Sequence, residues 1–151
     1  MAKYYSTKTY THAEGLSCAF RQWGAESHCR LLHGYAFEIK FEFGSTALDS
    51  CNWVVDFGSL KDLKVWLKHM FDHTTCVADN DPYLETFKDL NDKQLIDLRV
   101  VQKVGCEGFA EMIYNYSSKV IADTSNNRCW VQSVEVREHS GNSAKICNDT
   151  H

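Results

Sequence analysis

The alternation of apolar and charged side chains is clearest in the first third of the chain. Residues 36–43 read Ala-Phe-Glu-Ile-Lys-Phe-Glu-Phe, so that from Phe37 onward every second side chain is large and apolar. A period of two is typical of a strand with one buried face. We predict a strand over about residues 34–45 that ends at Gly44-Ser45.

A second strand is predicted at the start of the chain. Residues 3–12 are rich in Tyr and Thr, which favour strands, and we expect this strand to end at His12. We expect residues 13–33 to form a loop. The two strands should then pair as a long-loop hairpin that brings His12 and His33 close together.

Two later segments have the apolar spacing of amphipathic helices. The first is expected to begin near Ser59, which makes a capping-box-like start with Asp62, and to end around Phe71. The second is expected over about residues 106–121, with apolar side chains along one face.

Shorter strands complete the predicted layout. Alternation over residues 130–138 predicts one strand, and brief runs at 98–101 and 144–146 indicate two more, whereas residues 74–97 read as polar and irregular. The main elements follow the order strand-strand-helix-helix-strand-strand. This order favours a single α+β domain over residues 1–151, with a four-stranded antiparallel sheet and two helices on one face.

Composition and charge argue against several classes of protein. A net charge of −4 gives no reason to expect nucleic acid or an anionic membrane as a partner. No stretch approaches the roughly 18 apolar residues of a membrane-spanning helix, and the start Met-Ala-Lys-Tyr-Tyr-Ser lacks the apolar core of a signal peptide. We therefore expect a cytoplasmic protein whose seven cysteines are reduced and mostly buried.

Groups with chemical potential gather where the predicted loop enters the long strand. Cys29 is flanked by His28 and Arg30, which could lower the pKa of its thiol and make a thiolate available. The alternative is a buried structural cysteine. His33 and Tyr35 follow two residues apart, so they lie on one face of the predicted strand.

Two histidines at facing strand ends suggest a metal. His12 and His33 could share an ion, but a zinc site that activates a substrate needs about three protein ligands and one open position. Tyr35 and His28 are candidates for the missing ligand. The alternative is that His12 and His33 are ordinary hydrogen-bonded histidines.

Two acidic residues could also take part in chemistry. Asp72 and His73 could form a carboxylate-oriented imidazole, which acts as acid or base near neutrality; the alternative is a histidine favoured by the helix dipole. Glu138 could accept two N–H bonds from a guanidine-like or pyrimidine edge, or it could be a solvated charge at a strand end.

Five segments, in order along the chain, resemble the motifs of one enzyme family. They are Cys29-x-x-x-His33-Gly34 for C-x-x-x-H-G-H, Trp53-Val54-Val55-Asp56-Phe57-x-x-Leu60-Lys61 for W-[IV]-[IV]-D-F-x-x-L-K, Phe71-Asp72-His73 for L-D-H, Gly105-Cys106-Glu107-Gly108-Phe109-Ala110 for P-T-x-E-N-[LF]-A, and Val134-x-Val136-x-Glu138 for V-x-V-x-E-T. Over residues 3–146 the chain resembles the 6-pyruvoyl-tetrahydropterin synthase / 6-carboxytetrahydropterin synthase family. The cysteine-to-histidine spacing is closer to the 6-carboxy branch of the queuosine pathway.

The resemblance implies a fold, a substrate and a cofactor. The implied fold is the tunnelling (T-)fold, in which three subunits join their sheets into a barrel, two trimers stack as a hexamer, and sites lie between subunits. The implied substrate is 7,8-dihydroneopterin triphosphate, and a zinc ion is held by three histidines. A lyase of 7-deazaguanine (queuosine) or pterin biosynthesis is therefore expected, working as a homo-oligomeric trimer or hexamer.

The resemblance also assigns roles to residues of this chain. The proton-transfer groups would be Cys29, Asp72 and His73. Glu138 would grip the pterin edge and Glu107 would help to bind the substrate. The metal ligands would be His12, His33 and Tyr35.

The chain departs from the family pattern at the metal site. Tyr35 replaces the second histidine of H-G-H. The first zinc histidine corresponds either to His12, which we favour because its long loop to the cysteine is within family range, or to Phe20, because residues 16–21 also resemble F-x-A-A-H-R. With Phe20 in that place, only His33 remains. The alternative to a zinc lyase is a non-catalytic or altered member that binds a pterin or purine without metal.

Overall fold

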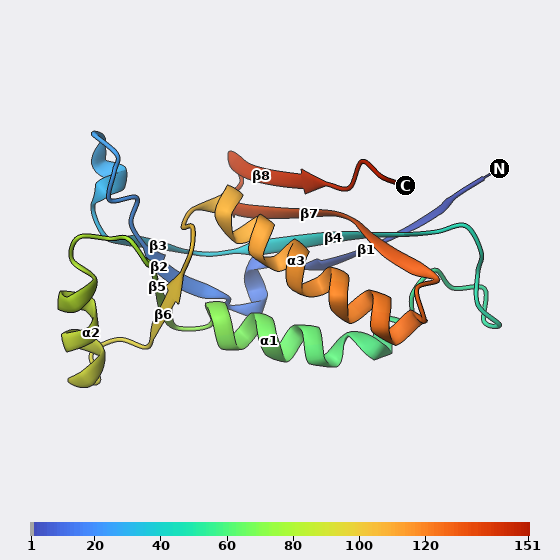
Figure 1. Ribbon diagram of the computed structural model, residues 1–151, viewed down its shortest axis with the longest axis horizontal. Coiled ribbons are helices and arrows are strands. Elements are labelled where there is room, and N and C mark those ends of the chain that lie inside the picture. Colours follow the sequence, from blue (N-terminus) through green and yellow to red (C-terminus); the bar gives the residue numbers. More distant parts are fainter. Residues whose placement is uncertain (1) are drawn as a thin grey trace.

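A long antiparallel sheet runs the length of the molecule (Figure 1). The computed structural model describes residues 2–151. The strands of this sheet lie in the order β1 (Tyr4–Tyr10), β4 (Glu38–Ser45), β7 (Cys129–His139) and β8 (Asn142–Cys147). All three pairings are antiparallel, with Ile39 between Tyr10 and Val136. The predicted four-stranded antiparallel sheet and the pairing of its first two strands are therefore confirmed, but β2 and β3 lie between those strands in the chain, so they do not form the predicted hairpin.

A second sheet lies at one end of the long one (Figure 1). Its strand order is β3 (His33–Ala36), β2 (Ser17–Phe20), β5 (Thr74–Ala78) and β6 (Leu98–Val101). Strand β2 is antiparallel to β3 but parallel to β5, which in turn is parallel to β6. This mixed sheet was not predicted.

Two helices pack together beneath the long sheet, and a third lies apart from them (Figure 1). They are α1 (Lys61–Phe71), α2 (Leu84–Asp92) and α3 (Cys106–Ser125), with short 3-10 turns η1 (His12–Glu14), η2 (His28–Arg30) and η3 (Phe57–Leu60). Trp66 of α1 stacks on Tyr116 of α3 with ring centroids 4.0 Å apart. Within residues 2–151, no helix has the length and apolar character needed to cross a membrane.

The predicted strand over residues 34–45 is in fact two strands that belong to different sheets. The break lies at Phe37, whose backbone N–H donates to the carbonyl of Leu16. Apolar side chains continue to alternate through the break, from Tyr35 to Phe37 to Ile39. Alternation therefore records which side chains point inward, but it does not reveal that the chain changes its pairing partner.

The prediction of two helices in the order ββααββ is incomplete. The expected loop at 13–33 contains β2, and the expected irregular segment at 74–97 contains β5 and α2. All five residues of β5 are buried, so that strand has no polar alternation to mark it. The helix α2 is only nine residues long and fully buries Phe87 alone, with Leu84 and Leu90 half-buried at helical spacing, so its apolar face is short.

The start of the first helix also differs from the prediction. Asp56, not Ser59, caps the helical segment, since its carboxylate accepts a hydrogen bond of 2.8 Å from the backbone N–H of Gly58. The hydroxyl of Ser59 donates to the carbonyl of Asp56 instead. The segment begins with η3 and continues into α1, which ends at Phe71 as expected.

Four phenylalanines join the two sheets to both long helices. Phe109 of α3 is fully buried and packs edge-on against Phe20 of β2, Phe37 between β3 and β4, and Phe71 at the end of α1. The ring centroids lie 5.3, 5.5 and 5.3 Å from that of Phe109. We call these four residues the aromatic cluster. Such edge-to-face pairs add to the stabilisation that burial provides.

A buried ion pair ties the loop after β2 to the segment that leads into α2. Arg21 donates to both carboxylate oxygens of Asp81, at 2.9 and 2.7 Å, and to the carbonyl of Arg30 at 3.2 Å. The Asp81 side chain is 1% exposed. Burial acts to raise the pKa of Asp81, but hydrogen bonds from Arg21 and from the backbone N–H of Tyr83 outweigh it and hold that pKa below its usual range.

Gly34 allows strands β2 and β3 to approach each other closely, and we expect Gly34→Ala to destabilise the protein. An added Cβ would lie 2.6 Å from the carbonyl oxygen of Cys18, a backbone atom that cannot move aside easily. The free energy of unfolding, measured by urea denaturation, should fall by about 1–3 kcal/mol. Gly24→Ala is the matched control, because its Cβ would meet nothing within 4 Å. Equal stability of the two variants would contradict this account.

Asp81→Asn should weaken the fold in a pH-dependent way. At neutral pH we expect the free energy of unfolding to fall by about 1.5–3 kcal/mol, because a charge-assisted pair is lost. A lowered folded-state pKa contributes stability above the unfolded pKa, and this stability is lost as pH falls. The difference from wild type should therefore shrink below about pH 4. Asp89→Asn, which breaks the exposed pair with Lys93, should change stability by less than about 1 kcal/mol.

Candidate functional site

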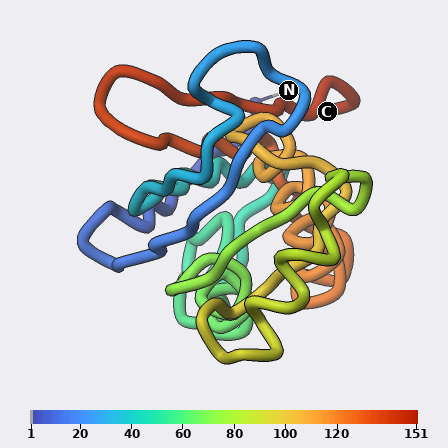
Figure 2. Tube along the Cα trace, turned by 90° about the vertical axis from the view of Figure 1, so that its left-hand side faces the viewer, coloured from blue at the N-terminus to red at the C-terminus, as the bar shows by residue number. Residues whose placement is uncertain are grey.

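An open cavity of about 750 Å³ lies at the end of the molecule where the two sheets meet. Its walls come from the end of β2, the η2 loop, β3, the start of α3 and the β7–β8 hairpin. Figure 2 looks at this end, with the η2 loop in blue and the hairpin in red both at the top of the view. Five of the predicted site residues line the cavity: Cys29, His33, Tyr35, Glu107 and Glu138.

The carboxylate of Glu138 is held on both oxygens. The thiol of Cys106 lies 3.8 Å from Oε2, and the side-chain amide of Asn142 donates to Oε1 at 3.2 Å. Burial, together with the charges of Glu138 and Glu107, raises the pKa of Cys106 to about 12. Cys106 is therefore a protonated donor at neutral pH, and it is not a nucleophile. The oriented carboxylate can accept N–H groups from a ligand.

Glu107 lies in the first turn of α3, immediately after the cavity-lining Cys106. The helix begins after Gly105, whose φ of 95° falls in a region that favours glycine. A carboxylate in the first helical turn is stabilised by the helix dipole. Glu107 thus adds a second negative group to the wall that carries Glu138.

The loop that carries Cys29 is tied down on both sides of the thiol. The backbone N–H of Cys29 donates to the Ser27 hydroxyl at 3.3 Å, and its carbonyl accepts from the N–H of Gln22 at 2.9 Å. The next carbonyl, of Arg30, accepts from Arg21. The thiol itself is exposed at the cavity wall, where a bound ligand can reach it.

Phe20, His33 and Tyr35 form one group at the β2–β3 wall. Phe20 pairs directly with His33 across the strands, with ring centroids 4.9 Å apart. Tyr35 lies two residues further along β3, with its ring 5.6 Å from His33 and 6.4 Å from Phe20. Burial, and then the negative charge of Glu138, raise the pKa of Tyr35, so its phenol stays protonated at neutral pH.

These residues do not fit the three-histidine zinc site that the resemblance implies. Phe20 offers no lone pair, and a protonated phenol such as Tyr35 is a poor zinc ligand. Nδ1 of His33 is already 2.7 Å from the carbonyl of Leu31, which leaves Nε2 as its one free nitrogen. Over residues 2–151, no three His, Cys, Asp or Glu side chains are grouped so that they could hold a metal ion.

His12 is not brought to His33 within the chain. Strand β1 ends at Tyr10, and His12 begins the turn η1, where its Nδ1 contacts the carbonyl of Ala36. Ala36 lies three residues along β3 from His33, which is about 10 Å at the usual strand rise. His12 is not among the cavity-lining residues, and neither is His28. The structure instead places Phe20 beside His33, as the alternative reading of residues 16–21 requires.

Asp72 and His73 form a hydrogen-bonded pair, but away from the cavity. Nδ1 of His73 lies 2.5 Å from Oδ1 of Asp72, in the turn between α1 and β5. The side chain of His73 is 87% exposed, and its φ of 58° is unusual for a residue other than glycine. An exposed imidazole oriented by a carboxylate is suited to proton transfer, and neither residue lines the cavity of its own chain.

The lining residues that were not predicted as part of a site include Cys106, Asn142 and Arg137. Cys106 directly precedes Glu107, and Asn142 lies across a tight hairpin from Glu138. Their closeness in sequence to predicted site residues could therefore have indicated them. The guanidinium of Arg137 already has partners within the chain. It donates to the carbonyl of Ser140 at 3.1 Å, and its Nη2 lies 3.6 Å from Oε2 of Glu135.

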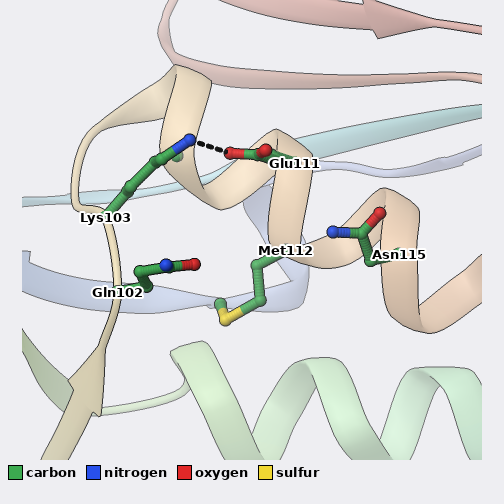
Figure 3. A pocket seen from close by; sticks show the side chains of 6 residues that line it. Gln102, Lys103, Glu111, Met112 and Asn115 are labelled. Carbon is green, nitrogen blue, oxygen red and sulfur yellow. Dashed lines mark hydrogen bonds and ion pairs between the residues drawn. The ribbon is translucent and has the colours of Figure 1, made fainter.

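A second, smaller cavity of about 180 Å³ lies between α3 and the segment after β6 (Figure 3). Lys103 and Glu111 form an ion pair of 2.7 Å at its rim, and Gln102, Met112 and Asn115 complete the labelled wall. Gly108 is needed here, because an added Cβ would lie 2.7 Å from Cβ of Lys103. None of the predicted site residues lines this cavity.

Comparison with known proteins gives matches at the level of both sequence and fold. The sequence model of the 6-pyruvoyl tetrahydropterin synthase family matches residues 9–149. Two curated relatives, both named 6-carboxy-5,6,7,8-tetrahydropterin synthase, come from Rickettsia conorii and Rickettsia bellii. They are 32% and 34% identical over 37% and 38% of this chain. The matched parts span only 41% and 43% of those relatives.

Solved structures share the fold over almost the whole chain. An uncharacterized protein from Wolinella succinogenes has a TM-score of 0.84 at 20% identity, covering 99% of this chain and 100% of that one. A catalytic-residue variant of Plasmodium vivax 6-pyruvoyltetrahydropterin synthase has a TM-score of 0.67 at 15% identity, with 97% and 98% covered. The Caenorhabditis elegans 6-pyruvoyl tetrahydropterin synthase has a TM-score of 0.60 at 17% identity, with 98% and 96% covered.

The family model spans nearly the entire chain, and the α+β fold agrees with that of the solved synthases. Cys29, Glu107 and Glu138, which match family motifs, line one cavity. The protein therefore belongs to the 6-pyruvoyl tetrahydropterin synthase family.

Proposed function

We propose that this protein is a lyase of the 6-carboxytetrahydropterin synthase type that acts on 7,8-dihydroneopterin triphosphate, in 7-deazaguanine (queuosine) or pterin biosynthesis. The observation that carries the proposal is that Cys29 and Glu138 open into the same cavity. The names of the two Rickettsia relatives support the 6-carboxy type.

The side chains around the cavity suggest how the substrate is held. Glu138, oriented by Cys106 and Asn142, accepts the N–H groups along the pterin edge. The cavity volume of about 750 Å³ is in the range typical of small-molecule sites. The planar ring then points its side chain toward the η2 loop.

Cys29 is placed to act on the substrate's side chain. As a thiolate it takes the proton from the carbon next to the one that loses triphosphate, so the C–O bond breaks as a C=C bond forms. The hydrogen bonds that anchor the backbone on both sides of Cys29 keep the thiol in place for this transfer.

The proton-transfer pair Asp72–His73 is assigned to a neighbouring copy of the chain. The pair is formed and exposed, yet it lies outside the cavity of its own chain. Strands β1 and β8 are the edges of the long sheet, and free edges are sites where further strands can pair. A trimer, or a hexamer of two trimers, would close the sheets into a barrel and bring the pair of one copy to the cavity of another.

A second candidate function is binding of a pterin or purine without turnover. It is supported by Tyr35, which replaces the second histidine of the H-G-H segment, and by Phe20, which lies beside His33. Triphosphate release distinguishes the two candidates, because binding alone releases none.

Cys29→Ala should abolish most of the lyase activity. We expect the rate of triphosphate release from 7,8-dihydroneopterin triphosphate to fall about 10²–10⁴-fold, because a positioned proton-transfer group is lost. The matched control is Cys51→Ala, another exposed cysteine that does not line the cavity, and its rate should stay close to wild type. If wild type releases no triphosphate, with or without added zinc, or if Cys29→Ala is unaffected, the proposed activity is wrong.

Glu138→Gln should weaken binding of neopterin. An amide presents one acceptor and one donor in place of two acceptors, so a charge-assisted contact is lost. We expect the dissociation constant, measured by fluorescence titration, to rise about 10–100-fold. The control is Glu85→Gln on α2, a side chain that is 86% exposed, which should leave binding unchanged. Equal affinity of the two variants would remove Glu138 from the binding site.

A further inference from the structure

We infer that the cavity takes its ligand without a metal ion. An aromatic wall made of Phe20, His33 and Tyr35 occupies the place of the metal site and stacks on a planar heterocycle that carries N–H groups along one edge. That the ligand has an N–H edge rests on the proposed function, in which Glu138 accepts the N–H groups of the ligand. The inference that no metal binds at this wall does not depend on the proposed function, because it follows from the donor atoms of the three side chains.

Phe20 is part of the core, so it cannot move aside to make room for a metal and its ligands. It is 4% exposed, packs edge-on against Phe109 and stacks on Phe37 with ring centroids 5.9 Å apart. Any ion shared by Phe20 and its two neighbours would meet a hydrocarbon ring on one side. That face of the site supplies no donor atom.

The two other members of the wall provide one nitrogen and one phenol. His33 has a single free nitrogen because Nδ1 faces the carbonyl of Leu31 at 2.7 Å. The hydroxyl of Tyr35 can bind zinc well only after losing its proton, beside the negative charge of Glu138. Catalytic zinc is held by about three protein ligands, so this pair is too small a set.

The same three side chains suit a different task. All three line the cavity, with His33 and Tyr35 half-buried and Phe20 buried. His139 extends the row, with its ring 5.8 Å from that of Tyr35. Aromatic faces bind planar rings by offset stacking and edge contacts. A heterocycle could lie against this wall while its N–H edge reaches Glu138, which lines the same cavity.

The test of the missing metal is to rebuild the imidazole set. Phe20 faces His33 across the strand pair, and Tyr35 lies two residues from His33 on the same strand, so the double variant F20H/Y35H adds two imidazoles to the existing one. Purified wild type dialysed against excess zinc and then buffer should retain no stoichiometric metal. F20H/Y35H should retain about one zinc per chain and give the visible spectrum of a tetrahedral site with Co²⁺.

Single variants keep the result interpretable if the core does not accept a histidine at position 20. Y35H on its own leaves Phe20 in the core and adds one imidazole, so it should bind zinc more tightly than wild type but below full occupancy. Stoichiometric zinc in wild type, removed together with neopterin binding by a chelator, would overturn the inference. These measurements of metal content and ligand binding do not require catalytic activity, so they test the inference even if the proposed lyase activity is wrong.

The stacking role is tested separately, with neopterin as the probe and a chelator present throughout. Y35A should raise the dissociation constant about 2–10-fold because a ring face is lost, whereas Y35F, which keeps the ring and loses the hydroxyl, should bind like wild type. Equal binding by Y35A and wild type would remove the wall from ligand recognition. Loss of binding in Y35F, but not in a chelator-treated wild type, would assign the effect to the hydroxyl instead.

Discussion

The packing of Phe20, Phe37 and Phe71 around Phe109 is the interaction on which the arrangement of this protein depends. These three rings come from β2, from the break between β3 and β4, and from the end of α1, so their contact with Phe109 sets the position of α3 against both sheets and against α1. Since interiors are close-packed, a shift of one element would be felt by the others. The aromatic cluster is therefore the reference against which the functional groups are placed.

The candidate site is built from residues that are near neighbours of that cluster in sequence. Cys106 and Glu107 lie within one helical turn of Phe109, and Tyr35 is two residues from Phe37. The β7–β8 hairpin brings Glu138 and Asn142 from the other end of the chain. A rigid core thus carries an open, polar cavity, which is the usual way to hold binding groups in place.

Membership of the synthase family does not depend on which side chains stand at the β2–β3 wall, for a physical reason. The fold is held by apolar packing, which does not require imidazoles at the cavity wall. Phe20 adds to that packing, because it stacks on Phe37 and packs edge-on against Phe109. The fold can therefore persist whichever of these side chains the wall carries.

The sequence by itself determined the elements whose signal is local. Helical spacing predicted α1 and α3, alternation predicted β4 and β7, and the motifs indicated Cys29, Glu107 and Glu138 as site residues. It could not reveal that residues 34–45 serve two sheets, because alternation reports burial and not the pairing partner. Only the tertiary structure decided between His12 and Phe20 as the neighbour of His33, since that choice depends on the register of β2 against β3, a long-range pairing that leaves no local pattern.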